Sequence, residues 1–109
     1  MSLAGEQADL LEAKAKALRA QADEVKRVRQ SLQLVVAEPK TTINSDGLTG
    51  PFATRMRERA IEISKRLSVA VDQLRSAEQR LRSSADTAAD AAANYRFQER
   101  LEIGKQLGR

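Results

Sequence analysis

The chain has 109 residues, which is enough for one small domain with a high surface-to-volume ratio and a small core. It contains no cysteine and no histidine, and so lacks the side chains that most often bind transition metals or act as nucleophile and general base. The net charge is +4, but acidic and basic residues alternate along the chain, so this charge alone does not indicate an anionic partner. We therefore predict a protein that is not an enzyme and needs no cofactor and no metal ion.

A first helix is predicted from about residue 4 to residue 38, because apolar residues recur there at alternating spacings of three and four. Arg29 falls on this apolar face, where we expect its stem to pack and its guanidinium to reach solvent. The Glu38-Pro39 step is predicted to end the helix, since proline disfavours helical geometry at the preceding residue. Two rows spaced by seven residues form the face, and two valines widen it: Leu11, Leu18, Val25 and Leu32; Ala8, Ala15 and Ala22; Val28 and Val35.

Residues 39–50 are predicted to form a loop, because they are rich in polar turn formers. Asn44, Asp46, Gly47 and Gly50 suit tight turns or positive φ. Gly50 and Pro51 are typical of an N-cap followed by the first position of a helix. We therefore expect the second helix to begin at residue 51.

The second helix is predicted over about residues 51–103. Folding the chain back at the loop gives an antiparallel hairpin, and placing Val36 opposite Phe52 brings Ala4 opposite about Ala85. Residues after Ala85 would then have no helix of their own chain to pack against. Two rows spaced by seven residues form the apolar face of this helix: Ala60, Leu67, Leu74, Leu81, Ala88 and Tyr95; Met56, Ile63, Ala70, Ala77, Ser84 and Ala91.

A hairpin buries one stripe on each helix, whereas these rows are wide enough to face two neighbours. We therefore expect residues 1–109 to form one all-α domain, an antiparallel two-helix hairpin that assembles with a second hairpin into a four-helix bundle dimer. The predicted dimer seam consists of Leu11, Leu18, Val25, Leu32, Leu67, Leu74 and Leu81.

Two other charged patterns are candidates for a catalytic site and a nucleic-acid-binding site. Asp86 and Asp90 lie four residues apart, but no glycine-rich phosphate loop or third catalytic group accompanies them, which favours a solvated helix face. A strip of arginines is interrupted by acidic residues and matches no nucleic-acid-binding motif. No leader peptide or apolar run long enough to span a bilayer is recognised. The strip consists of Arg75, Arg80, Arg82, Arg96 and Arg100.

The chain resembles the WxG helical-hairpin family of type VII (ESX) secretion substrates. In the place of the family's Trp-x-Gly turn it has Leu48-Thr49-Gly50, directly before the second helix. Near its end it has Tyr95-Arg96-Phe97-Gln98-Glu99, which matches the family's signal of Tyr followed after three residues by Asp or Glu. Leucine in place of tryptophan suggests a divergent branch of the family.

This resemblance implies export by a route that needs no signal peptide, from the cytoplasm to the outside of the cell. It implies pairing with a related small helical-hairpin protein, as a heterodimer, or with itself. It also implies that an FtsK/SpoIIIE-type ATPase recognises Tyr95 and Glu99 in a C-terminal secretion tail, about residues 95–109. The apolar residues of this tail would fit a groove of the ATPase: Phe97, Leu101, Ile103 and Leu107. The alternative is a cytoplasmic coiled-coil adaptor or a basic nucleic-acid-associated dimer.

Overall fold

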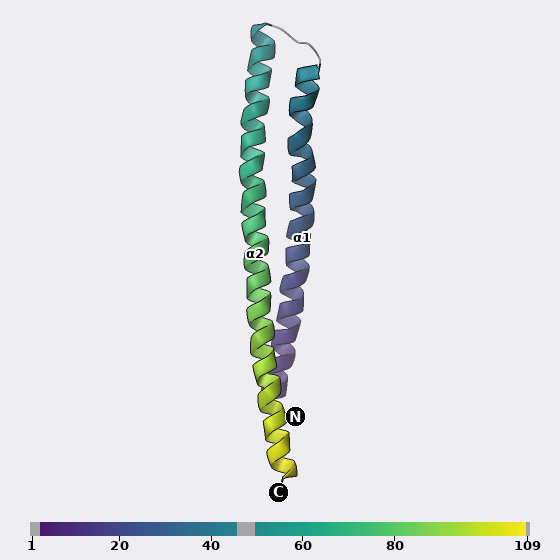
Figure 1. Cartoon of the computed structure of the whole chain (residues 1–109), viewed down its shortest axis with the longest axis vertical. Helices are drawn as coiled ribbons and strands as arrows, with labels where there is room; N and C mark the ends of the chain where they lie inside the picture. Colours follow the sequence, from purple (N-terminus) through teal and green to yellow (C-terminus); the bar gives the residue numbers. More distant parts are fainter. Residues whose placement is uncertain (1–2, 46–49, 109) are drawn as a thin grey trace. The chain divides into compact units, whose positions relative to one another are not determined.

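The computed structural model describes the backbone of residues 3–45 and 50–108, and the side chains of residues 3–35 and 50–108. Within these residues the chain forms two long helices and no strand: α1, Leu3–Ser45, and α2, Pro51–Leu107 (Figure 1). The predicted all-α fold is therefore confirmed, and the two helices are consistent with a helical hairpin. The four-helix bundle stays a prediction.

The end of α1 differs from the prediction. The helix does not stop at Glu38-Pro39 but continues to Ser45. Proline removes one backbone hydrogen bond and crowds the carbonyl four residues earlier, at a cost of about 3 kcal/mol inside a helix. A cost of this size is local and can be outweighed in a long packed helix, so proline is a probable helix boundary and not a certain one.

The start of α2 agrees with the prediction. The Gly50 carbonyl accepts hydrogen bonds from the Thr54 N–H at 3.0 Å and from the Thr54 hydroxyl at 3.1 Å, which makes Gly50 the N-cap. Its φ of +96° lies in a region that glycine adopts without strain. Pro51 follows at the first helical position, where its missing N–H leaves no hydrogen bond unmade. Leu48, the other residue of the predicted turn motif, lies outside the described residues.

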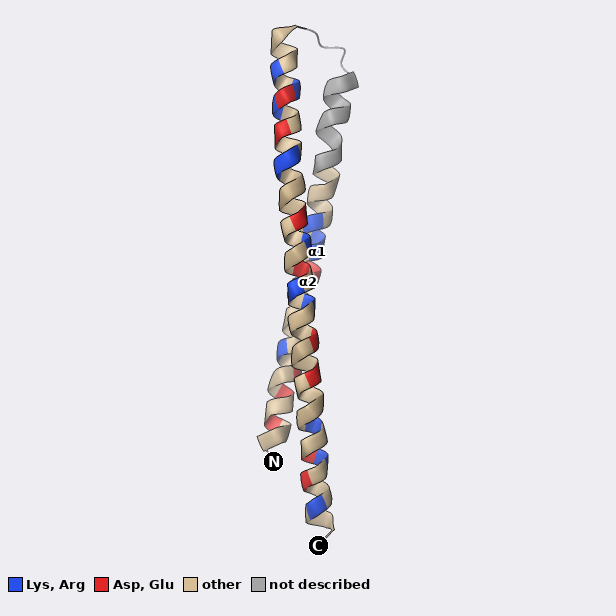
Figure 2. Ribbon diagram, turned by 60° about the vertical axis from the view of Figure 1, so that its left-hand side comes forward, with Lys and Arg blue, Asp and Glu red and all other residues tan. Residues whose placement is uncertain are grey.

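The chain divides into two compact units. Unit 1 combines the chain up to Asp23 with the chain from Glu78 onward, and unit 2 is Glu24–Ala77. Each unit therefore contains a segment of α1 and a segment of α2, which lie side by side in both ribbon views (Figures 1 and 2). Unit 2 has ten Lys/Arg and six Asp/Glu residues, whereas unit 1 has nine of each. The whole net charge of the chain therefore belongs to unit 2.

The core of unit 1 is built almost entirely from alanine. Alanine lets two helix backbones approach closely, toward the lower end of the usual 8–10 Å range. Each such contact buries little apolar area, so packing alone gives this core limited stability. The buried alanines come from both helices: Ala4, Ala8, Ala15 and Ala22 of α1, and Ala85, Ala88 and Ala92 of α2.

Ion pairs between the helices define the register of unit 1. Arg19 pairs with Asp86 at 3.5 Å. Four residues further along α1, Asp23 pairs with Arg82, which lies four residues earlier on α2, at 3.1 Å. Asp9 and Arg96 are paired in the same antiparallel register. By extension, Ala4 lies level with about Leu101.

The predicted register was therefore wrong, and with it the prediction that residues after Ala85 lack a helix of their own chain to pack against. In that register Arg82 would lie level with Gln7, and Asp86 level with Leu3. The observed register instead places Asp23 beside Arg82 and Arg19 beside Asp86, and it covers the alanine-rich run of α2 with the alanines of α1. The prediction failed because it placed Val36 directly opposite Phe52; the continuation of α1 to Ser45 accounts for only part of the shift.

The rows of α2 agree with the prediction in part. The first row is an inner row: Ala60 and Ala88 are buried, and the three leucines and Tyr95 are half-buried. The second predicted row agrees only in part, because Ala70, Ala77 and Ala91 are half-buried whereas Met56, Ile63 and Ser84 are exposed. The more buried second row lies one residue further along α2, with Ser64 in place of Ile63. Its buried members are Ser64, Val71, Glu78, Ala85 and Ala92.

Candidate functional site

Tyr95 and Glu99 lie on the side of α2 that faces α1. Tyr95 continues the inner row of Leu81 and Ala88, and Glu99 continues the row of Ala85 and Ala92. Both side chains are half-buried. As predicted from their spacing, they share one face of the helix, but α1 partly covers this face.

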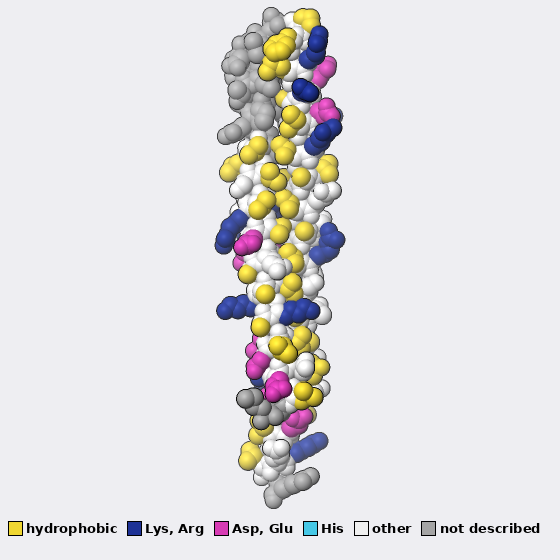
Figure 3. Space-filling view, turned by 180° about the vertical axis from the view of Figure 1, so that it is seen from behind, with side chains coloured by type: hydrophobic (Ala, Val, Ile, Leu, Met, Phe, Trp, Pro, Cys, Tyr) yellow, Lys and Arg dark blue, Asp and Glu magenta, His cyan; other side chains and the backbone are white. Residues whose placement is uncertain are grey.

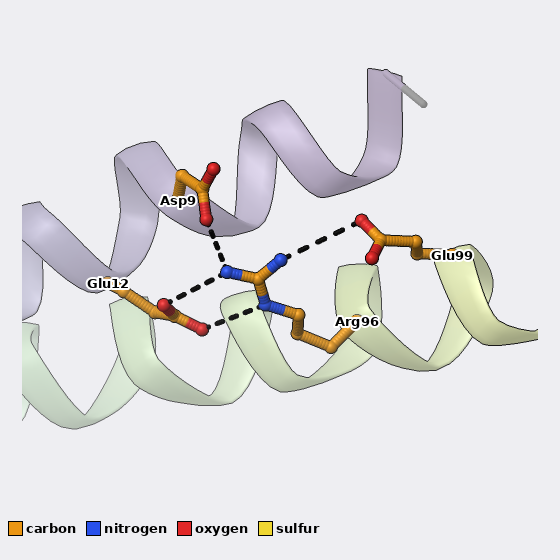
Figure 4. Close-up of polar contacts among 4 residues, drawn as sticks. All are labelled: Asp9, Glu12, Arg96 and Glu99. Atoms are coloured by element: carbon orange, nitrogen blue, oxygen red, sulfur yellow. Dashed lines mark hydrogen bonds and ion pairs between the residues drawn. The ribbon is translucent and has the colours of Figure 1, made fainter. Parts of the chain in front are cut away.

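Arg96 lies between them and contacts three carboxylate side chains, those of Asp9, Glu12 and Glu99 (Figure 4). Its Nε donates to Glu12 Oε1 at 3.1 Å and its Nη2 donates to Glu12 Oε2 at 3.1 Å, which is a bidentate pair. Nη2 also donates to Asp9, and Nη1 lies 3.7 Å from Glu99 Oε2. One guanidinium therefore joins two carboxylates of α1 to the second residue of the predicted signal.

Arg96 is the permanently charged member of this cluster. Hydrogen bonds to Glu12 and Asp9 raise the pKa of the Arg96 guanidinium above its already high ordinary value. The Arg96 side chain therefore remains positively charged at every pH at which the chain is folded. It is also partly exposed to solvent, so added salt should weaken its attraction to the carboxylates.

A shallow groove runs along this end of unit 1. It is lined on one side by Gly5, Glu6 and Asp9 of α1 and on the other by residues of α2 that include Arg96, Glu102 and Ile103. The first turns of α1 therefore lie beside the segment that the sequence suggested would be unaccompanied.

The apolar residues of the C-terminal segment remain largely uncovered. Phe97, Leu101, Ile103 and Leu107 are 46% to 82% exposed. They form two pairs of residues four apart, Phe97 with Leu101 and Ile103 with Leu107, on two sides of the last turns of α2, and so do not form a single stripe. Among the predicted tail residues, the structure thus places Tyr95 and Glu99 toward α1 and these four toward solvent.

The predicted dimer seam lies on the inner face of the hairpin. Each of its residues is half-buried, whereas the alanines next to them are fully buried. Part of every leucine and valine in the set is therefore still accessible at the edge of the helix pair. Arg29, which the sequence placed in the same face, is half-buried; its Nε is buried and its Nη1 donates to Gln33 at 3.5 Å.

The other charged patterns form ion pairs. Asp86 pairs with Arg19 of α1, and Arg82 pairs with Asp23 and Glu78. Arg75 lies 3.6 Å from Asp72. Three of the five arginines of the strip, Arg75, Arg82 and Arg96, thus lie beside carboxylates. Figure 2 shows basic and acidic residues interleaved along α2. Among the described residues, no group of His, Cys, Asp and Glu has an arrangement that could hold a metal ion.

Sequence reasoning missed Arg96 as a site residue. The sequence pattern placed it only in a basic strip, although the acidic residues near the start of the chain could pair with it. Glu12 and Asp9 stand on the polar side of the first helix, but pairing them with Arg96 requires the correct register, which the sequence did not provide.

No protein-family model, curated protein or solved structure matches the chain. Neither described helix contains a stretch that is long and apolar enough to cross a membrane.

Proposed function

We propose that the chain is a small non-enzymatic substrate of a type VII (ESX) secretion system. In this proposal it leaves the cell as a paired helical hairpin, without a signal peptide, and an FtsK/SpoIIIE-type ATPase recognises the end of its second helix. The specific elements recognised are Tyr95 and Glu99 together with the exposed apolar residues around them.

One observation carries the proposal. Four large apolar side chains remain exposed in the last three turns of α2, next to Tyr95 and Glu99. Exposed apolar residues at the end of an ordered helix are suited to a groove on another protein. Binding of an already helical segment also avoids part of the ordering cost of a disordered tail.

The alternative function is a basic nucleic-acid-associated dimer or a cytoplasmic coiled-coil adaptor. The observation in its favour is that unit 2 carries the whole net charge of +4. However, Arg66 and Arg75 of this unit each pair with a carboxylate of their own helix, which leaves fewer cations for phosphates. Export therefore accounts better for the apolar end of α2.

Replacing both Phe97 and Leu101 with serine tests the proposal. Because both side chains are exposed, the double variant should fold as the wild-type chain does, with stability changed by about 0.5 kcal/mol or less per site. Its affinity for the purified cytoplasmic part of the ATPase should fall about tenfold or more, since exposed apolar anchors dominate such interfaces. Fluorescence anisotropy of the labelled full chain would measure this.

Leu34→Ser with Val69→Ser is the matched control, because these residues are also apolar and exposed but lie away from the end of α2. The control should bind with wild-type affinity. Equal loss of affinity in both double variants would show that the binding depends on general surface hydrophobicity, and would contradict recognition at the end of α2.

A further inference from the structure

The first turns of α1, residues 3–12, lie beside Tyr95 and Glu99 within unit 1. In the register that the ion pairs define, Leu10 is level with Tyr95, and Glu6 is level with Glu99. Both residues of the predicted signal are half-buried on the side of α2 that faces α1. A protein that packs on this side of α2 would therefore compete with the first turns of α1 for the same surface.

Apolar packing holds these turns of α1 weakly. Between residues 3 and 12, the buried side chains are those of two alanines, Ala4 and Ala8. Leu11 is half-buried, and Leu10 is 66% exposed. Because hydrophobic stabilisation is roughly proportional to the apolar area removed from water, two methyl groups and part of a leucine contribute little to it.

One guanidinium supplies the opposite charge that joins these turns to α2. Carboxylates of both helices line the groove at this end of unit 1: Glu6 and Asp9 of α1, and Glu99 and Glu102 of α2. Figure 3 shows acidic side chains gathered at this end of the helix pair, on the face that it presents. Among the described residues that line the groove, Arg96 is the one with a basic side chain. Repulsion between the two helices is therefore balanced mainly by Arg96.

The ion pairs of Arg96 with α1 are open to solvent. The exposed fraction is 34% for the Arg96 side chain, 70% for Asp9 and 53% for Glu12. Exposed ion pairs add little to stability, and salt weakens them further. A segment held by two alanines and by such pairs is suited to local opening while the rest of unit 1 stays folded.

We propose that residues 3–12 form a cover over Tyr95 and Glu99, and that this cover must open before the secretion ATPase can bind these two residues. The inference rests on the proposed function and adds a regulatory step to it. The closed form lowers the apparent affinity by the fraction of chains that are open. The ATPase shifts the chain toward the open form because its contacts with Tyr95 and Glu99 exist only there.

A reversible cross-link that holds the cover closed tests this inference. The chain has no cysteine, so Glu12→Cys with Arg96→Cys provides a unique pair of thiols, at positions whose side chains meet at 3.1 Å. A bismaleimide with a disulfide in its spacer would join them. The linked chain should bind the immobilised cytoplasmic part of the ATPase about tenfold or more weakly than the same chain after the spacer is reduced. Biolayer interferometry would measure both affinities.

Asp23→Cys with Arg82→Cys is the matched control for the cross-link. This pair joins the same two helices of unit 1, and its side chains also meet at 3.1 Å, but it lies more than three helical turns from Tyr95. Linking it should leave the affinity for the ATPase nearly unchanged, because the cover remains able to open.

Weakening the hold on the cover should have the opposite effect. Asp9→Asn with Glu12→Gln removes both carboxylates of α1 that pair with Arg96, and should raise the affinity for the ATPase about threefold or more. Asp23→Asn with Asp86→Asn is the control, because it removes two paired carboxylates of unit 1 away from the cover. This control should bind as the wild-type chain does.

The possible results separate the cover from the proposed function. If the chain linked at positions 12 and 96 binds as tightly as its reduced form, or if the link at positions 23 and 82 weakens binding equally, the cover is overturned and recognition at the end of α2 is not. The cover is also overturned if Asp9→Asn with Glu12→Gln binds no more tightly than its control. Absence of any binding by the wild-type chain would overturn the proposed function, and the cover with it.

Discussion

Replacing Tyr95 with alanine is expected to reduce export at least about tenfold. In the proposed function the aromatic ring is the anchor that a groove of the ATPase takes in, and truncating an aromatic anchor is among the most damaging changes at such an interface. Tyr95 is half-buried, so the loss of packing should be smaller than the roughly 3–5 kcal/mol seen for buried aromatic residues. Quantitative blotting of culture medium and cells would measure the exported fraction, and circular dichroism the remaining helicity.

Leu81→Ala is the control for the loss of packing, because Leu81 lies in the same inner row two heptads earlier and is also half-buried. It should reduce thermal stability at least as much as Tyr95→Ala and still permit export. If both variants lose export to the same extent, the effect of Tyr95 is one of stability, and its role as a signal is not supported.

The second large effect is expected at Arg96. The change Arg96→Glu would place a fourth carboxylate beside those of Asp9, Glu12 and Glu99, where the guanidinium now joins them. Repulsion should separate the first turns of α1 from the last turns of α2. Amide hydrogen exchange in residues 97–107 should then become about tenfold faster or more, because these turns lose contacts that limit local opening.

Arg100→Glu changes the net charge equally at an exposed position of the same segment and should leave exchange nearly unchanged. Adding Glu12→Arg to Arg96→Glu reverses the pair and should restore part of the protection, which a general charge effect would not do. No restoration would show that Glu12 and Arg96 are not neighbours in solution, and the observed register would then be wrong.

The sequence predicted those features of the fold that depend on local periodicity. The spacing of Ala8, Ala15 and Ala22 placed them correctly on the inner face of α1, and Gly50-Pro51 placed the start of α2. Both depend on residues within one or two helical turns of each other, for which helix geometry and capping preferences suffice.

The register between the helices could not be predicted in the same way. It depends on where the chain reverses, and the assumption that Val36 lies opposite Phe52 shifted every pair of opposing residues. Pairing Arg82 with Asp23 and Arg96 with Glu12 would have identified the correct alignment, but only a comparison of all possible registers would have revealed these matches. The same shift hid the Arg96 cluster.

The second predicted row of α2 failed for a different reason. Ile63 and Ser64 lie three and four residues after Ala60, so either could continue the inner face of the helix. Hydrophobicity alone favours Ile63 for the buried position. The structure has Ser64 buried and Ile63 exposed, because close helix packing selects small side chains.

The most direct test of the account is to express the full chain in cells of a bacterium with a type VII system, with and without a working secretion ATPase. The account predicts that the chain accumulates in the medium of the first strain and stays inside the cells of the second. Equal amounts in the two media, or retention inside both strains when an established substrate is exported normally, would contradict it.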